Sequence, residues 1–239
     1  MCPFTIDHPI MLQRWERLTF VHWSFDPSTV QRLLPEWLQV ETFEGVAWVG
    51  LVPFFMRVAT RSGSQVPWLS HFCETNIRTY VRDREGRSGI WFFSLDAARL
   101  GAVIAARASY RLPYFWSRMR LGARGSEIAY QCRRRWPNPQ SATSGVRVRI
   151  GEPFTASELD ERDHFLTARW VLFSSAGDRT RFARAWHAPW QLHRADVVDV
   201  DDRLIIAAGL PSPQEDPIVH YSPGVDVRIG RPERYPSRA

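Results

Sequence analysis

The sequence predicts a β-rich protein of the α+β class. Many segments alternate apolar and polar residues with a period of two, residues typical of turns separate them, and few segments carry helical signals. No stretch has the composition of a linker, so we expect residues 1–239 to form a single domain.

The strands of the N-terminal half are predicted from this alternation. Residues 41–54 predict two strands that meet at Phe43-Glu44-Gly45, with Pro53 ending the second. Residues 72–82 predict a strand with one polar face, and residues 89–95 predict the next. Turn residues separate these last two strands, so we expect an antiparallel hairpin.

Two helices are predicted from capping signals. Asp96 is a suitable N-cap for a helix over about residues 97–110, and Pro113 ends that helix. Residues 155–158 fit a capping box before a shorter helix that extends to about Leu166.

The C-terminal half predicts more strands than helices. Further strands are expected at residues 128–133, 146–150, 170–173, 179–186 and 225–229. Residues 195–210 predict a hairpin that turns at Asp201-Asp202, and residues 230–239 predict a flexible tail.

The basic composition does not predict a nucleic-acid partner. All 31 basic residues are arginine, and the net charge is +6. The arginines are spread along the chain, often beside acidic residues, and Arg133-Arg134-Arg135 is the one block of three. Because side chains alternate across a strand, these three arginines do not share a face. Nucleic-acid binding is therefore the least favoured functional hypothesis for this chain, and it requires one continuous basic surface.

The sequence lacks the signals that are typical of membrane proteins, secreted proteins and nucleotide-binding enzymes. The longest apolar stretch, Val46 to Phe55, is shorter than a membrane span, and no signal peptide is recognised at the start. Three cysteines without metal-binding spacing indicate reduced thiols and a cytoplasmic protein. No nucleotide, dinucleotide or hydrolase motif occurs, so no cofactor and no metal are expected. The sequence does not determine the oligomeric state, and a homo-oligomer is one of the alternatives.

The polar ladder Glu74-Asn76-Arg78-Tyr80 is the first candidate for chemistry. Its side chains share one face of the predicted strand at 72–82. That face either meets solvent or lines a ligand cavity inside a closed sheet, and the pattern alone favours solvent.

Arg107 and the histidines are further candidates. Arg107 falls on the apolar stripe of the predicted helix, where it either extends to solvent or is buried against a carboxylate, with Glu74 the expected partner. His22, His187 and His220 show no metal-binding spacing, and structural roles are the more common ones for such histidines.

Several motifs together resemble the uncharacterised bacterial YqjF-like family, within the acetoacetate decarboxylase-like superfamily. The resemblance covers about residues 11–229. The motifs are Trp15-Glu16-Arg17-Leu18-Thr19-Phe20 before His22-Trp23, Leu33-Leu34-Pro35, residues 45–54, 74–81 and 89–96, Ala106-Arg107, Leu112-Pro113-Tyr114 and His220-Tyr221-Ser222.

The resemblance implies a closed antiparallel β-barrel or cone with short flanking helices and an interior pocket. Glu74 matches the position of a pocket glutamate in the decarboxylase, and Arg107 matches an arginine. The catalytic lysine has no counterpart, because Tyr114 or Phe115 occupies its segment and the sequence contains no lysine. Decarboxylation through an imine on a lysine side chain is therefore excluded.

The leading hypothesis is a small-molecule pocket with acid/base chemistry on an oxo acid or a similar carbonyl compound. Glu74 would act as acid and base, Tyr114 would donate a hydrogen bond to the substrate, and Arg107 or Arg78 would bind a carboxylate. Asn76, Tyr110 and His22 are the other expected pocket residues. The alternative is a carrier or sensor that binds a ligand in the same pocket without turnover.

Overall fold

The computed structural model describes residues 2–60, 63–64, 70–137, 142–176 and 179–234. Its strands are β1 (Met11–Phe25), β2 (Leu38–Val40), β3 (Thr42–Phe43), β4 (Val46–Thr60), β5 (His71–Asp83), β6 (Ser88–Ala97), β7 (Tyr114–Arg124), β8 (Glu127–Trp136), β9 (Thr143–Pro153), β10 (Val171–Ala176), β11 (Arg179–His187), β12 (His193–Asp202), β13 (Ile218–Ile229) and β14 (Glu233–Arg234). Its helices are α1 (Pro27–Gln31), α2 (Leu100–Ser109), α3 (Glu161–Thr167) and α4 (Leu204–Ala207). Strands therefore dominate, as predicted.

Hydrogen-bonded strands follow one another around a ring. The ring runs β1–β4–β5–β6–β7–β8–β9–β12–β13 and returns to β1. A second path, β6–β10–β11–β13, links two members of this ring. The expected antiparallel pattern holds for most pairs, but β6 pairs in parallel with both β7 and β10. The parallel pairing of β6 with β7 arises because α2 carries the chain back between these two strands.

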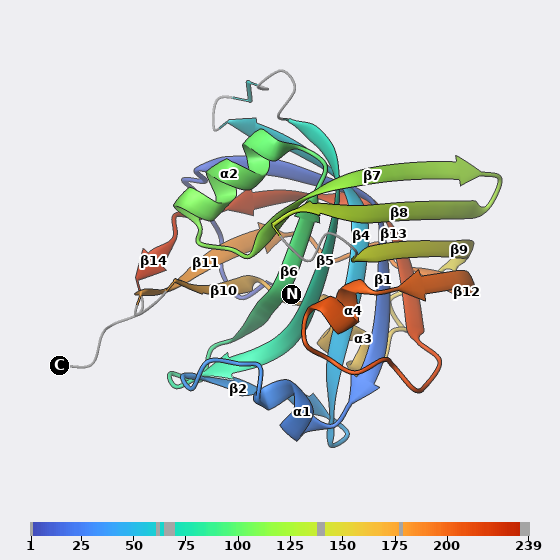
Figure 1. The fold of residues 1–239 in the computed structure, drawn as a ribbon, viewed down its shortest axis with the longest axis horizontal. Coiled ribbons are helices and arrows are strands. Elements are labelled where there is room, and N and C mark those ends of the chain that lie inside the picture. The colour runs from blue at the N-terminus through green and yellow to red at the C-terminus, as the bar shows by residue number, and fades with distance from the viewer. Residues whose placement is uncertain (1, 61–62, 65–69, 138–141, 177–178, 235–239) are drawn as a thin grey trace.

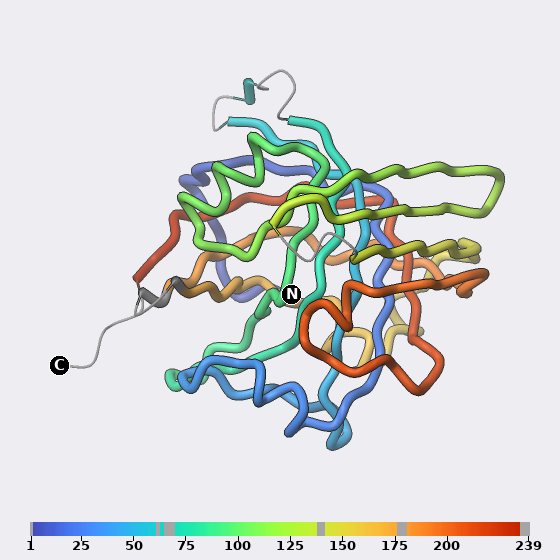
Figure 2. Tube along the Cα trace, in the orientation of Figure 1, coloured from blue at the N-terminus to red at the C-terminus, as the bar shows by residue number. Residues whose placement is uncertain are grey.

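The central strands separate two regions of the molecule. In Figure 1, β1, β4, β5 and β13 run through the middle, with α2, β10 and β11 on one side and β8, β9, β12 and α4 on the other. The trace in Figure 2 shows β7 and β8 as a long hairpin that extends beyond the ring. Each central strand therefore presents its alternating side chains to two different environments.

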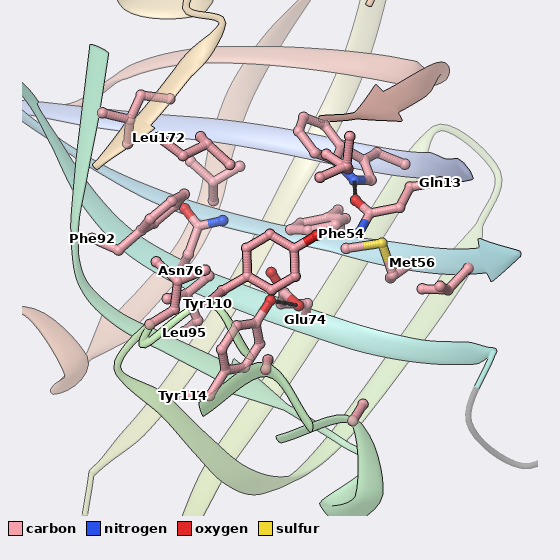
Figure 3. A pocket seen from close by; sticks show the side chains of 18 of the residues that line it. Gln13, Phe54, Met56, Glu74, Asn76, Phe92, Leu95, Tyr110, Tyr114 and Leu172 are labelled. Atoms are coloured by element: carbon pink, nitrogen blue, oxygen red, sulfur yellow. Dashed lines mark hydrogen bonds between the residues drawn. The ribbon is translucent and has the colours of Figure 1, made fainter. Parts of the chain in front are cut away.

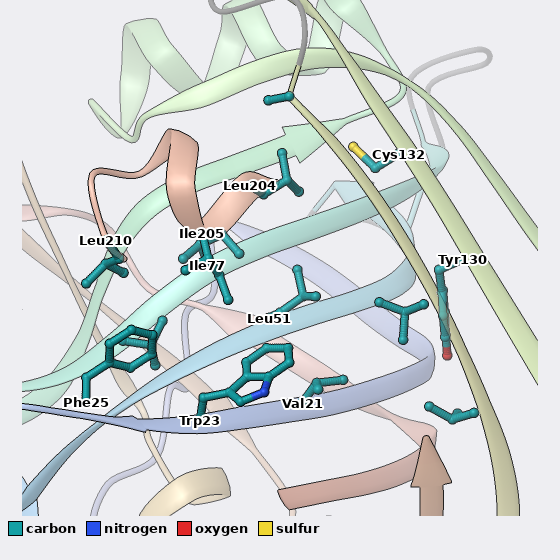
Figure 4. Close-up of a cluster of buried hydrophobic side chains, with 14 of the residues drawn as sticks. Val21, Trp23, Phe25, Leu51, Ile77, Tyr130, Cys132, Leu204, Ile205 and Leu210 are labelled. Atoms are coloured by element: carbon teal, nitrogen blue, oxygen red, sulfur yellow. The ribbon is translucent and has the colours of Figure 1, made fainter. Parts of the chain in front are cut away.

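The main apolar core fills the side that contains α4. Val21, Leu51 and Ile77, from β1, β4 and β5, are fully buried there against Leu204 and Ile205 of α4 (Figure 4). The opposite faces of β4 and β5 carry the residues that line the candidate site described below. The alternation of the sequence thus assigns adjacent residues to core and site.

An irregularity in β1 lets its side chains change faces. Arg17 has a positive φ of 49°, and the register with β4 shifts between Glu16 and Val21. Opposite this bulge, Gly224 has a φ of 141°, and a Cβ there would lie 2.3 Å from the carbonyl oxygen of Trp15. Only glycine fits such a close approach of two backbones.

Pro53 does not end its strand, contrary to the prediction. β4 continues to Thr60, and Pro53 pairs with Thr75 of β5. Pro53 lies between Leu51 and Phe55, where the pairing of β4 with β1 is interrupted by the bulge. The missing N–H of proline is therefore placed where the neighbouring strand does not form a regular ladder.

The predicted start of the first long helix was wrong. Asp96 lies inside β6, fully buried, and α2 begins at Leu100 after Arg99, which makes no side-chain cap. The Asp96 carboxylate accepts hydrogen bonds from Arg134 Nε at 2.9 Å and Nη2 at 2.7 Å, and from Ser117 Oγ at 2.6 Å. A carboxylate held by a buried arginine is not free to cap a helix.

Two other local predictions also need correction. The capping box belongs to Asp160 and Asp163 at the start of α3, whereas Thr155 and Glu158 hydrogen-bond to each other in the preceding turn. The expected hairpin at 195–210 is strand β12 followed by α4, because Asp202 accepts a hydrogen bond from the Ile205 N–H and starts a helical turn.

The remaining differences concern elements with weak patterns. No strand was predicted at β1 or β7, where exposed arginines and the bulge interrupt the alternation. Within the expected tail, Glu233–Arg234 form β14 against β11, and residues 235–239 lie outside the described residues. None of the helices in the described ranges has the length and apolar character needed to cross a bilayer.

Candidate functional site

A cavity of about 260 Å³ lies between the central strands and α2, and we call it the α2 pocket. Apolar side chains from several strands form most of its wall, among them Trp15, Leu18, Phe54, Met56, Phe92 and Leu172. The α2 face is made of small residues, including Ala102, Ala105 and Ala106. The polar side chains of the wall include Glu74, Asn76 and Arg78 of β5, and Tyr110 and Tyr114 next to α2.

Glu74 is buried in this wall, with 2% of its surface exposed. The Tyr114 hydroxyl donates a hydrogen bond to Glu74 Oε2 at 3.0 Å, and Figure 3 shows both side chains meeting beside Tyr110. Burial raises the pKa of Glu74 to about 8, the Tyr114 hydrogen bond lowers it in part, and the Asp96 charge raises it further. Glu74 is therefore mostly a neutral carboxylic acid at pH 7.

The two tyrosines beside Glu74 are neutral hydrogen-bond donors. Burial raises the pKa of Tyr110 to about 12, and burial together with the Glu74 charge raises the pKa of Tyr114 well above its ordinary value. The Tyr110 hydroxyl is buried and has no partner among the described residues. It is therefore available to a molecule in the α2 pocket.

Asn76 and Arg78 continue the polar face of β5 beyond Glu74. Both side chains are buried, with 5% and 6% of their surface exposed. Asn76 Oδ1 and Arg78 Nε have no hydrogen-bond partner in the described part of the chain. Sequence alternation placed Glu74, Asn76 and Arg78 on one face, and this face borders the α2 pocket rather than solvent.

Arg107 does not form the expected ion pair with Glu74. It is half-buried on α2, its Nη1 donates to the Tyr114 carbonyl oxygen at 2.7 Å, and its guanidinium lies over the Trp136 ring. No described carboxylate lies within ion-pairing distance of Arg107, and it is not among the residues lining the α2 pocket. Its side chain packs instead against the start of β7 and the end of β8.

His22 also lies outside the α2 pocket wall. It is fully buried behind that wall, where its Nε2 is 2.6 Å from the Tyr80 hydroxyl. Burial and the Arg78 charge hold the pKa of His22 well below its ordinary value, so the ring is neutral. Gly50 faces this ring, and a Cβ there would lie 2.8 Å from His22 Nε2.

His187, Arg169 and Trp190 line the α2 pocket although none was predicted to do so. A structural role was the more common one expected for His187, and burial lowers its pKa. Arg169 pairs with Glu41 Oε2 at 3.3 Å and lies over the Phe165 ring. Arg169 lies between α3 and β10, His187 ends β11 and Trp190 follows that strand, so no periodic pattern indicated which way these side chains point.

Other sequence-based expectations concern groups away from the α2 pocket. His220 Nε2 contacts Asp163 Oδ1 at 2.9 Å, a structural pair beside α3. Cys2, Cys73 and Cys132 are free thiols, as the odd count indicated. Within the described ranges, no three or more His, Cys, Asp and Glu residues are grouped as a metal site would require.

Comparison of the fold identifies solved structures of similar shape. An acetoacetate decarboxylase-like enzyme from Sphingomonas wittichii RW1 superposes with a TM-score of 0.66 at 13% identity, covering 96% of this chain and 94% of that one. The enduracididine biosynthesis enzyme MppR, complexed with pyruvate, gives 0.66 at 12% identity, with 97% and 93% covered. Acetoacetate decarboxylase from Legionella pneumophila gives 0.62 at 14% identity, with 98% and 92% covered. These likenesses establish the acetoacetate decarboxylase-like fold.

Comparison of sequences gives the family. The chain is 36% identical over 220 residues to the uncharacterized protein YqjF of Bacillus subtilis (strain 168), covering 91% of this chain and 89% of that protein. Residues 12–226 match the model of the DUF2071 family, described as "Uncharacterized conserved protein". The chain therefore belongs to the DUF2071 family.

Proposed function

We propose that the α2 pocket binds a small carbonyl compound, with oxo acids included, and that Glu74 transfers a proton next to its carbonyl group. The observation that carries this proposal is the hydrogen-bonded pair of Glu74 and Tyr114 on the wall of a largely apolar pocket. A carboxyl group with a pKa of about 8 is a much stronger base, once ionised, than an exposed carboxylate.

The proton transfer requires only groups that the chain contains. In its ionised form Glu74 removes a proton from the carbon beside the carbonyl, and the electron pair moves onto the carbonyl oxygen. The Tyr114 hydroxyl then donates its hydrogen bond to that oxygen, which carries the developing negative charge. Return of the proton from Glu74 to carbon completes an exchange, and its return to a different carbon gives an isomer.

Two features of the family and fold support this proposal. The sequence offers no lysine amine, so an imine on a lysine side chain is not available to this pocket. The related fold of MppR holds pyruvate in one of its structures, an oxo acid of small size. A proton transfer on such a compound that needs no lysine fits both the absence of a lysine amine and the neutral carboxylic acid of Glu74.

Hydrogen exchange tests the proposal directly. Pyruvate, acetoacetate and 2-octanone are incubated with the protein in D2O across a pH series that brackets the pKa of Glu74, and deuterium incorporation beside the carbonyl is followed by NMR. We expect exchange that rises with pH and levels above about pH 8, as Glu74 becomes ionised. Borohydride is expected to trap no adduct on the protein.

Variants identify the group responsible. Glu74→Gln is expected to abolish exchange and Tyr114→Phe to slow it, whereas Glu152→Gln, at an exposed position of β9, serves as the matched control. Exchange that persists in Glu74→Gln would refute the proposal. A ligand that raises the melting temperature without any exchange would instead establish the carrier or sensor alternative, which the predominantly apolar wall also suits.

The partners and location proposed for this protein follow from its surface and thiols. Three free cysteines support a cytoplasmic protein. Many arginines pair with carboxylates, as Arg14 does with Asp226 and Arg194 with Glu158, and within the block of three, Arg134 is buried. Such a mixed surface supports a small molecule, rather than a nucleic acid, as the partner.

A further inference from the structure

We propose that the natural ligand is an elongated, mainly apolar carboxylate whose anionic end binds Arg78 and whose carbonyl group lies at Glu74, several bonds away. This inference rests on the function proposed above, because it uses the same pocket. It narrows the ligand from any small carbonyl compound to a medium-chain acid with a remote oxo group.

The first step is the unusual position of Arg78. Its side chain is buried, and no described carboxylate lies within 4.0 Å of its guanidinium, in contrast to Arg134, which is buried against Asp96. Arg78 is held instead by the Leu166 carbonyl oxygen at 3.2 Å and by the face of the Phe20 ring. A buried guanidinium without a counter-charge is costly, and an anionic ligand group would supply that charge.

The second step is the direction of the guanidinium. Arg78 Nη2 lies 3.4 Å from the Tyr80 hydroxyl and contacts the end of α3, so the group extends along β5 away from Glu74. Four residues separate Glu74 from Arg78 on an extended strand, which places their Cα atoms about 13 Å apart. The anion site and the acid therefore lie toward opposite ends of the pocket wall.

The third step is what lies between these two ends. Asn76 occupies the intermediate position on the same face of β5, and its buried Oδ1 has no described partner. The other walls are apolar, including Leu18, Val52 and Phe54. The unsatisfied Asn76 oxygen indicates that a ligand or a bound water completes the site. Because the other walls are apolar, the body of the ligand must be largely hydrocarbon.

This geometry separates the two functional groups of the ligand. In acetoacetate the carbonyl and the carboxylate are one carbon apart, so a molecule with its carboxylate at Arg78 would not place its carbonyl at Glu74. A chain such as 7-oxooctanoate has an apolar spacer between the two groups. The cavity of about 260 Å³ lies just below the range typical of drug-sized ligands, in keeping with a slender ligand.

Calorimetric titration with three probes tests the inference. In 7-oxooctanoate the carboxylate and the carbonyl are far apart, and in acetoacetate they are close together. The third probe, 2-octanone, has a carbonyl but no carboxylate. We expect 7-oxooctanoate to bind the wild-type chain at least about tenfold more tightly than either of the others, because a charge-assisted contact is worth roughly that factor or more. Equal or tighter binding of acetoacetate would overturn the inference.

Variants at Arg78 locate the anionic end. Arg78→Met is expected to weaken 7-oxooctanoate binding about tenfold or more and to leave 2-octanone binding unchanged, whereas Arg133→Met, on the exposed face of β8, should change neither. Arg78→Lys keeps a cation and should preserve the preference for 7-oxooctanoate over 2-octanone. Wild-type-like carboxylate binding by folded Arg78→Met would overturn the inference.

Failure of this inference is distinguishable from failure of the proposed function. If only the inference is wrong, deuterium exchange will depend on Glu74 but the affinity for carboxylates will not depend on Arg78 or on chain length. If only the proton transfer is wrong, 7-oxooctanoate will bind in an Arg78-dependent manner and no exchange will occur.

Discussion

The Tyr114 hydroxyl donates a hydrogen bond to Glu74 Oε2 at 3.0 Å, joining the first residue of β7 to a residue near the start of β5. The two residues are 40 positions apart in the chain, and both side chains are enclosed by the wall of the α2 pocket. This hydrogen bond favours the charged form of Glu74 in a site whose burial disfavours that charge, and the first two predictions follow from this balance.

Replacing Glu74 by glutamine should make stability less dependent on pH. The pKa of Glu74 is raised from 4.5 to about 8 in the folded chain, so its contribution to stability is complete below pH 4.5 and is lost as pH rises toward 8. The total loss is on the order of 4 kcal/mol. Urea unfolding of wild type and Glu74→Gln at several pH values measures the difference. Parallel curves between pH 5 and about 8 would contradict the buried neutral acid.

Removing the Tyr114 hydroxyl should raise the pKa of Glu74 further. That hydrogen bond favours the charged carboxylate, so Tyr114→Phe removes a stabilising contact from the ionised form. The carboxyl band of Glu74 in infrared difference spectra should then titrate at higher pH than in wild type. Tyr110→Phe is the matched control, since its hydroxyl has no described partner. An unchanged or lower midpoint in Tyr114→Phe would argue against this hydrogen bond.

Breaking the buried pair of Arg134 and Asp96 should destabilise the fold strongly. Their side chains are 1% and 0% exposed, with Nη2 and Oδ2 2.7 Å apart, and the pair connects β6 to β8. Arg134→Met leaves a buried carboxylate without its partner and should lower the free energy of unfolding by about 3–5 kcal/mol. Arg133→Met, one residue away on the exposed face, should change it by less than about 0.5 kcal/mol. Similar losses in both variants, measured by chemical denaturation, would exclude this explanation.

Adding a methyl group at Gly50 should displace His22. The new Cβ would lie 2.8 Å from Nε2 and 2.9 Å from Cδ2 of the His22 ring, closer than carbon atoms approach one another in proteins. Gly50→Ala should therefore lower stability by about 1–3 kcal/mol. Gly122→Ala in β7, where nothing lies within 4 Å, is the matched control and should be neutral or stabilising. Thermal melting of both variants makes the comparison, and an equally stable Gly50→Ala would contradict the packing of this ring.

Strand periodicity in the sequence is enough to assign residues to a common face. Alternation in residues 72–82 placed Glu74, Asn76 and Arg78 on one face of a strand. The same alternation in the strand that contains Arg133, Arg134 and Arg135 separates Arg134 from its two neighbours. The absence of lysine is enough to exclude imine chemistry on a lysine side chain. These conclusions hold because strand periodicity and side-chain chemistry are local properties.

What each face meets depends on long-range contacts in the folded chain. The helical stripe left open whether Arg107 pairs with Glu74, yet Arg107 hydrogen-bonds the Tyr114 carbonyl oxygen and the Tyr114 hydroxyl contacts Glu74 instead. Asp96 was a suitable helix cap by its local sequence, and Arg134, 38 positions later, holds it within a strand. Burial and partner choice depend on segments far apart in the chain, so no local period encodes them.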